Sequence, residues 1–166
     1  MSKIKVGDKV PAITFNALKD GEWVGVSTDD IFSGKTVALF ALPGAFTPTC
    51  SEKHLPGYMD NKAELEAAGV DSICCLSVND TFVMNAWAKS QGIEGHINII
   101  PDGNADFTKG VGMDVMKSNI GFGIRSWRYS MLVKDGVVEK IFEEDRNDAG
   151  DPFAVSDAET MLASMG

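Results

Sequence analysis

Long hydrophobic runs are missing from this sequence. The longest uninterrupted apolar stretch covers only residues 37–42, whereas a membrane-spanning helix needs about 20 consecutive apolar residues. The first residues, 1–6, are too few and too mixed in polarity for a secretory signal. We therefore expect a cytoplasmic protein that does not associate with a membrane.

Positive charge is scarce as well. The 166 residues include 15 Lys and Arg against 24 Asp and Glu, which gives a net charge of −9. Such a chain would repel a nucleic-acid backbone, so nucleic acid is excluded as a partner. With 44% hydrophobic and 23% charged residues the composition is that of a globular protein, and the length predicts one domain over residues 1–166.

Cysteine is rare, and its three residues form no pattern typical of metal sites. An odd number of cysteines argues against a secreted disulfide framework and favours a reducing compartment. Cys50 and His54 have the spacing of a ligand pair, but a second pair is missing and His96 is isolated, so we expect neither a metal nor a bound cofactor. The Cys-x-x-Cys motif of dithiol oxidoreductases is also missing, because Thr47 stands where the first cysteine would be.

The hydrophobic pattern predicts alternating strands and helices in the middle of the chain. Residues 36–42, 70–78 and 97–100 are apolar runs typical of buried strands. Residues 62–68 and a segment after Asp80 have helical composition, and each stops at a glycine.

Hairpins and a terminal helix are predicted on either side of this region. Asp-Gly pairs at residues 20–21 and 135–136 lie between strand-like segments and indicate two β-hairpins. Ser156 and Glu159 have the spacing of a capping box at the start of a last helix. The sequence therefore predicts an α/β fold with a mixed central β-sheet flanked by helices and an N-terminal β-hairpin.

The segment from Pro43 to Cys50 follows the central predicted strand, at the edge where α/β proteins usually place their ligands. Thr47 suits the N-cap of a helix and Pro48 its first position, which puts Cys50 at the third. The unpaired backbone N–H groups and the dipole at a helix start favour thiolate over thiol. Cys50 is therefore predicted to be an activated nucleophile rather than a small buried hydrophobe, with Pro43 shielding one side.

Cys74 and Cys75 are expected to serve packing. They lie in the middle of a predicted strand and point to opposite faces of the sheet. The Pro56-Gly57 pair that follows Cys50 is predicted to interrupt the helix.

The motif Pro43-x-x-x-Thr47-x-x-Cys50 resembles the active-site signature of the peroxiredoxins. Residues 42–48, 77–80 and 128–131 resemble the peroxiredoxin 5 subfamily of the AhpC/TSA superfamily. Further motifs, Gly121-Phe122-Gly123 and Gly150-Asp151-Pro152-Phe153, are similar to the peroxiredoxin half of bacterial peroxiredoxin–glutaredoxin hybrid proteins. The resemblance covers nearly the whole chain, which stops before any glutaredoxin domain, and it implies a thioredoxin fold.

The resemblance also implies functional roles. Cys50 matches the peroxidatic cysteine, Thr47 the hydroxyl that holds the peroxide, Pro43 the shield, and Arg128 the arginine that stabilises the thiolate. Arg125 is the competing candidate for the last role, and otherwise would be a solvated surface charge. The implied activity is reduction of hydrogen peroxide and alkyl hydroperoxides through a sulfenic acid on Cys50.

The resemblance implies partners too. Since no resolving cysteine stands near the last helix, glutathione is the expected reducing co-substrate, with a separate glutaredoxin, and thioredoxin remains possible. A homodimer that packs through Phe46, Phe82 and Phe122 is expected, although these residues could instead belong to the core.

Two alternatives to the peroxidase function remain open. They are a thioredoxin-like disulfide reductase, which the missing Cys-x-x-Cys argues against, and a non-catalytic binding or holdase domain, which would not need Pro43, Thr47, Cys50 and Arg128 together.

Overall fold

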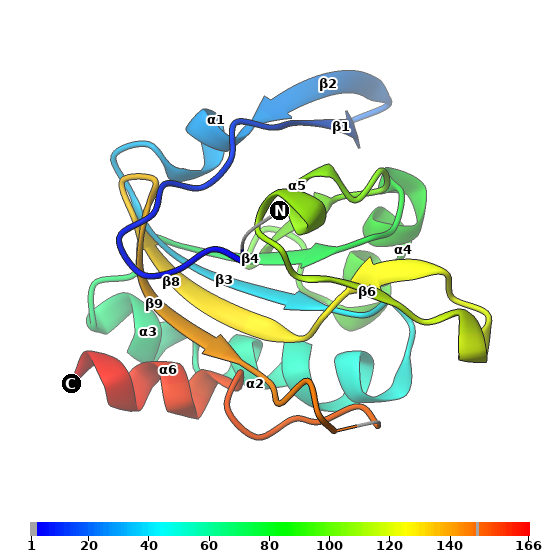
Figure 1. The fold of residues 1–166 in the computed structure, drawn as a ribbon. Coiled ribbons are helices and arrows are strands. Elements are labelled where there is room, and N and C mark those ends of the chain that lie inside the picture. The colour runs from blue at the N-terminus through cyan, green and yellow to red at the C-terminus, as the bar shows by residue number, and fades with distance from the viewer. Residues whose placement is uncertain (1–2, 149) are drawn as a thin grey trace.

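The computed structural model describes residues 3–148 and 150–166, and a five-stranded mixed sheet runs through its centre (Figure 1). The strands lie in the order β5-β4-β3-β8-β9. Their bounds are Thr36–Leu42 (β3), Ser72–Ser77 (β4), Asn98–Pro101 (β5), Tyr129–Lys134 (β8) and Val137–Glu143 (β9). The pairs β3–β4 and β4–β5 are parallel, whereas β3–β8 and β8–β9 are antiparallel. The predicted mixed sheet is confirmed.

Strand β3 is central because its side chains are apolar on both faces. Phe40 and Leu42 belong to the core on one face of the sheet, and Leu39 and Ala41 to the core on the other. A strand that is buried on both sides appears in the sequence as a continuous apolar run rather than an alternating one. This explains why residues 36–42 could be recognised.

Helices cover both faces of the sheet. Figure 1 shows α2, α3 and α6 below it, with α1, α5 and the first hairpin above it. The helices are α1 (Thr28–Phe32), η1 (Cys50–His54), α2 (Leu55–Asp60), α3 (Lys62–Ala67), α4 (Thr81–Gln91), α5 (Asp106–Gly110) and α6 (Ala158–Met165). Trp87 of α4 and Tyr58 of α2 pack in the same core as Phe40, so the face that carries the start of η1 is the more helical one.

Both Asp-Gly turns form the predicted hairpins. β1 (Thr14–Lys19) pairs with β2 (Glu22–Ser27), and Asp20 and Gly21 between them have φ values of 52° and 81°. Such values are those of the two-residue turns that match the twist of paired strands. A further small pair, β6 (Asp114–Met116) with β7 (Ile124–Ser126), lies on either side of the 3₁₀ turn η2 (Ser118–Ile120) and was not predicted.

The start of the last helix differs from the prediction. Asp157, not Ser156, is the N-cap of α6, and its carboxylate accepts a hydrogen bond from the Thr160 backbone N–H at 3.1 Å. The Ser156 hydroxyl instead donates to the buried carboxylate of Glu144 at 2.6 Å. A partner that is distant in the sequence therefore removes Ser156 from the cap.

Candidate active site

The loop after β3 brings Cys50 to the start of a helical segment. Residues 48–49 are α-helical and Cys50 begins the π-helical turn η1, so Cys50 has the third helical position, as predicted. The side chain of Thr47 accepts no hydrogen bond from the described backbone N–H groups at the helix start, and its hydroxyl donates to the carbonyl oxygen of Gly44 at 2.6 Å. Cys50 and Pro43 are both buried, whereas Thr47 is partly exposed.

The predicted interruption at Pro56-Gly57 is wrong. The helical path continues through both residues, and the backbone N–H of Leu55 donates to the carbonyl of Cys50, five residues earlier. A proline ring normally clashes with the carbonyl of the residue four positions before it, and the wider π turn gives this ring room. The turn places both Cys50 and His54 in the buried interior.

Arg128 lies directly against the sulfur of Cys50. It is 1% exposed, stands just before β8, and its Nη2 donates to Cys50 Sγ at 3.2 Å. The same Nη2 lies 2.9 Å from each carboxylate oxygen of Asp151, and Nε donates to Asp151 Oδ1 at 3.2 Å. The structure therefore brings together Cys50 and Arg128, and it adds Asp151, which the sequence reasoning missed.

His54 completes this buried group. Arg128 Nη1 lies 2.9 Å from His54 Nδ1, and His54 Nε2 lies 3.0 Å from the Ser156 carbonyl oxygen. Since a guanidinium can only donate hydrogen bonds, Nδ1 must accept and Nε2 must carry the proton. Burial, reinforced by the charge of Arg128, holds the pKa of His54 well below its usual value, so the ring is neutral.

Residues 150–156, which we call the strap, lie against the group formed by Cys50, Arg128 and His54. Glu144, which directly follows β9 and is 2% exposed, holds the strap. The Glu144 carboxylate accepts from the backbone N–H groups of Ala154, Val155 and Ser156 at 2.8–3.0 Å. The strap in turn carries Asp151 to Arg128 and the Ser156 carbonyl to His54. No local sequence signal marks Glu144, since its partners are ten or more positions away.

Arg125 is not a fully solvated surface charge, the alternative role for this residue. It is half-buried, its Nη1 donates to the Pro43 carbonyl at 3.1 Å, and its Nε donates to the Phe122 carbonyl at 3.2 Å. Of the two arginines, Arg128 is the one that contacts Cys50 Sγ. Arg125 instead holds the loop that leads to Cys50.

Cys74 and Cys75 are buried on opposite faces of the sheet, as predicted, and all three cysteines are free thiols. Burial raises the pKa of Cys74 to about 11 and that of Cys75 well above its usual value. Neither thiol is therefore poised to react as a thiolate near neutral pH.

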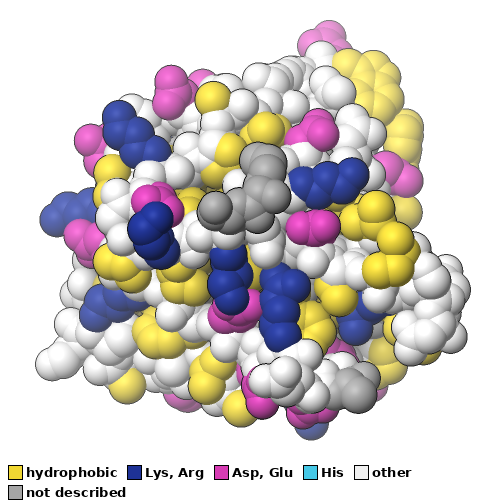
Figure 2. Space-filling model, in the orientation of Figure 1, with side chains coloured by type: hydrophobic (Ala, Val, Ile, Leu, Met, Phe, Trp, Pro, Cys, Tyr) yellow, Lys and Arg dark blue, Asp and Glu magenta, His cyan; other side chains and the backbone are white. Residues whose placement is uncertain are grey.

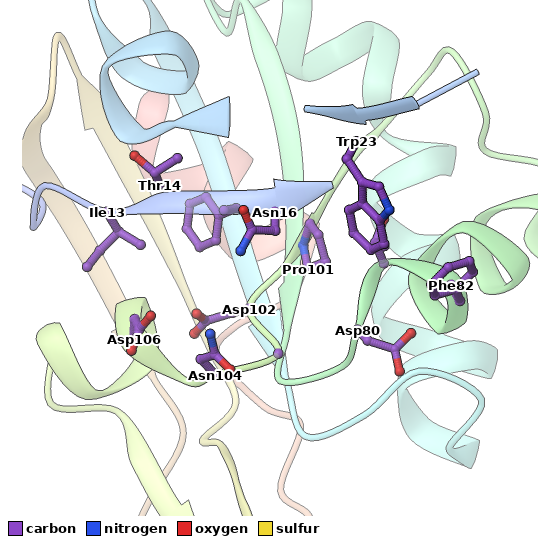
Figure 3. A pocket seen from close by; sticks show the side chains of 13 residues that line it. Ile13, Thr14, Asn16, Trp23, Asp80, Phe82, Pro101, Asp102, Asn104 and Asp106 are labelled. Atoms are coloured by element: carbon purple, nitrogen blue, oxygen red, sulfur yellow. The ribbon is translucent and has the colours of Figure 1, made fainter. Parts of the chain in front are cut away.

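The cavity drawn in Figure 3 is separate from this group. It has a volume of about 370 Å³ and lies between β1 and the loop after β5, with Trp23 and Phe82 at one end. The described residues that line the cavity do not include Cys50, Thr47 or Arg128.

Metal clusters and membrane spans are both absent from the described residues. Residues 3–148 and 150–166 contain no group of three or more His, Cys, Asp or Glu side chains arranged to hold a metal ion. Within the same residues no helix is both long enough and apolar enough to cross a bilayer.

Comparisons with known proteins agree on one family. The family model described as Redoxin matches residues 5–162. Hybrid peroxiredoxin hyPrx5 of Haemophilus influenzae is 58% identical over 94% of this chain, which spans 64% of the length of that hybrid. Peroxiredoxin sll1621 of Synechocystis is 51% identical over 95% of this chain and 89% of its own length. The crystal structure of reduced Prx3 from Vibrio vulnificus in complex with H2O2 superimposes with a TM-score of 0.90 at 43% identity, covering 98% of this chain and 99% of that one.

Proposed function

We propose that Cys50 is the residue that reduces the peroxide. The premise is that this chain belongs to the Redoxin family and is a peroxiredoxin, which is a thiol-dependent peroxidase. The fold is the thioredoxin-like fold of that family. The observation that carries the proposal is the 3.2 Å contact between Arg128 Nη2 and Cys50 Sγ. A buried guanidinium beside a sulfur attracts the anionic form, which is the nucleophile.

The proposed reaction is attack of the Cys50 thiolate on one oxygen of a hydroperoxide. An S–O bond forms, the O–O bond breaks, and Cys50 becomes a sulfenic acid. The departing oxygen leaves as hydroxide or alkoxide and takes a proton to give water or an alcohol. The N–H donors of Arg128 stabilise the charge that develops on that oxygen.

Thr47 and Pro43 have supporting roles in this proposal. The Thr47 hydroxyl donates its hydrogen bond to the Gly44 carbonyl. Its oxygen can therefore accept a hydrogen bond from the O–H group of the peroxide. Pro43 is buried next to this loop and keeps water from one side of the sulfur. Hydrogen peroxide and alkyl hydroperoxides are the proposed substrates, and H2O2 is the ligand named for the reduced Vibrio vulnificus relative.

Glutathione, together with a glutaredoxin, is the proposed reductant. The sulfenic acid reacts with one glutathione to give a mixed disulfide and water. A second glutathione then releases Cys50 and forms oxidised glutathione, an exchange that glutaredoxin would accelerate. Two observations support a reductant from outside the chain. Cys74 and Cys75 are buried with raised pKa values, and the relative from Haemophilus influenzae is a hybrid. Thioredoxin is the alternative reductant. A cytoplasmic location would supply either one.

A homodimer is the proposed assembly. Phe46 and Phe82 are 56% and 59% exposed, and Phe122 is partly exposed, so these rings have apolar area that a second copy could cover. Sedimentation equilibrium should give about twice the 17.8 kDa of one chain. A mass of one chain at micromolar concentration would contradict the dimer.

Peroxide consumption tests the proposed reaction. The wild type and Cys50→Ser are compared with glutathione plus glutaredoxin and with thioredoxin plus its reductase, and Cys74→Ser is the matched control. We expect Cys50→Ser to fall to the uncatalysed rate, because serine cannot form the sulfenic acid, and Cys74→Ser to keep most of the activity. Turnover that survives in Cys50→Ser would contradict the nucleophile, and a wild type that consumes no peroxide would favour a non-catalytic binding domain.

A further inference from the structure

The side chain of Arg125 lies against the backbone of the loop that leads to Cys50. Its two hydrogen bonds go to the carbonyls of Pro43 and Phe122. A Cβ atom placed on Gly44 would come within 2.7 Å of Arg125 Nη1 and 3.2 Å of Thr47 Cγ2. The guanidinium therefore occupies space that a side chain at position 44 would need, one residue from the proposed shield Pro43.

Arg125 and Arg128 differ in their charge balance. Arg128 is neutralised by Asp151, whereas Arg125 forms no salt bridge within the part of the chain that the structure describes. Several exposed lysines, such as Lys53 and Lys89, form no salt bridge among the described residues either, but of the three arginines only Arg125 lacks one, since Arg146 pairs with Glu143. Figure 2 shows positive and negative side chains interspersed on one face. Arg125 is thus an uncompensated cation in a chain whose net charge is −9.

The unused donors of Arg125 are held ready for an anion. A guanidinium has five N–H groups, and the two hydrogen bonds of Arg125 use one on Nε and one on Nη1. One donor on Nη1 and two on Nη2 have no partner among the described residues, and a guanidinium can use such donors to bind a carboxylate. The ring of Phe122 lies 4.9 Å from the guanidinium carbon and restricts it further. Little conformational freedom would therefore be lost on binding.

Arg125 is only partly removed from solvent. Burial lowers its pKa, and an electrostatic contribution from Cys50 acts in the opposite direction. The group remains a cation at neutral pH. An anion bound to it would be held beside the loop that leads to Cys50.

We propose that Arg125 is a binding site for a carboxylate of the thiol that recycles Cys50. This inference rests on the proposed function and names the recognition group for its reductant. Hydrogen peroxide is neutral and has no group for a second cation, whereas glutathione carries two carboxylates. An anionic thiol is repelled by the overall charge of −9 and needs a local cation in order to dock.

The bond changes do not involve Arg125. The thiol sulfur attacks the sulfenic acid sulfur of Cys50, an S–S bond forms, the S–O bond breaks, and the oxygen leaves as water after taking the thiol proton. Arg125 holds the carboxylate while this happens. Its substitution should therefore change the reduction step according to the charge of the thiol.

Single-turnover kinetics isolate this step. Cys50 is first oxidised to the sulfenic acid with one equivalent of H2O2 and then mixed with glutathione or with its diethyl ester, in which both carboxylates are blocked. The comparison is repeated with 3-mercaptopropionate and the neutral 2-mercaptoethanol. The variants are Arg125→Gln and Arg125→Lys, and Lys53→Gln is the matched control, because Lys53 is an exposed cation in η1 close to Cys50 in the sequence.

We expect Arg125→Gln to slow the reaction with glutathione about tenfold and the reaction with the ester less than about twofold. Arg125→Lys should lie between wild type and Arg125→Gln, since it keeps the charge and loses the fork. Lys53→Gln should leave both reactions within about twofold, as expected for an exposed charge. Equal slowing with glutathione and with the ester would overturn the proposal and assign Arg125 to holding the loop.

The same experiment separates two kinds of failure. If wild-type sulfenic acid does not react with glutathione, the proposed reductant is wrong, and the pair 3-mercaptopropionate and 2-mercaptoethanol still tests Arg125. If glutathione reacts but Arg125→Gln keeps the wild-type ratio between glutathione and its ester, only the carboxylate site is wrong.

Discussion

The three cysteines differ in what surrounds each sulfur. Cys50 has a guanidinium nitrogen at 3.2 Å, whereas Cys75 is packed among apolar side chains on the same face of the sheet. Burial is the main cause that raises the pKa of Cys75, and the neighbouring Cys50 raises it further. The two thiols share a core but differ in their surroundings, because only the sulfur of Cys50 is in contact with a cation.

Substitution of Cys75 tests this contrast at the level of one residue. Cys75→Ser should keep most of the glutathione-supported peroxidase rate, because a thiol held protonated by burial does not resolve the sulfenic acid. The buried hydroxyl should cost about 1–2 kcal/mol of unfolding free energy, measured by urea titration. A natively folded Cys75→Ser that has lost its glutathione-supported rate would instead identify Cys75 as the resolving thiol.

The sequence could indicate only those candidate site residues that belong to one short motif or to the family pattern. Pro43, Thr47 and Cys50 stand within eight positions, so helix-start chemistry could place them together. His54 was considered only as a metal ligand, because its contact with Arg128 joins residues 74 positions apart. Asp151 and Glu144 were missed for the same reason, since each acts through the three-dimensional arrangement of the strap.

At the scale of elements, strands with apolar runs and Asp-Gly turns were predictable, and short elements were not. α5 and the β6–β7 pair contain too few residues for a periodicity to show. α5 is instead held by a residue that precedes it, because the Asp102 carboxylate accepts from the backbone N–H and the hydroxyl of Thr108. The π turn at Cys50 is likewise a response of the helix to Pro56, which the sequence indicated only as a break.

The Glu144 carboxylate is predicted to stabilise the strap. Glu144→Gln replaces two acceptor oxygens with one oxygen and an NH2 group, which must then face a backbone N–H of residues 154–156. The loss should be about 2–3 kcal/mol of unfolding free energy, with faster hydrogen exchange at those amides. The matched control is Glu143→Gln, whose carboxylate pairs with Lys3 and Arg146 and which should cost less than about 1 kcal/mol. Unchanged exchange in the strap of Glu144→Gln would show that the carboxylate does not hold it.

For the whole molecule, the arrangement of charge around the site links its stability to pH. Arg128 is buried, and besides the sulfur of Cys50 it contacts the carboxylate of Asp151 and the neutral ring of His54. A proton added to His54 would put a second cation against the guanidinium and would remove the acceptor at Nδ1. The folded state therefore resists protonation of His54, whereas the unfolded chain binds a proton below about pH 6.5.

The sign of the resulting pH dependence follows from linkage. Because the pKa of His54 is lowered in the folded state, its contribution to stability is fully present above about pH 6.5 and is lost as the pH falls below that value. Between pH 7.5 and 5.5 this one residue should remove about 1.4 kcal/mol from the unfolding free energy. Urea titrations at several pH values should show that decline in wild type and in His96→Gln, whose histidine is exposed, and a shallower one in His54→Gln. The slope of the unfolding free energy against pH tests the prediction even where His54→Gln is less stable at every pH. An equal slope in His54→Gln and wild type would mean that His54 is not held neutral by burial and Arg128.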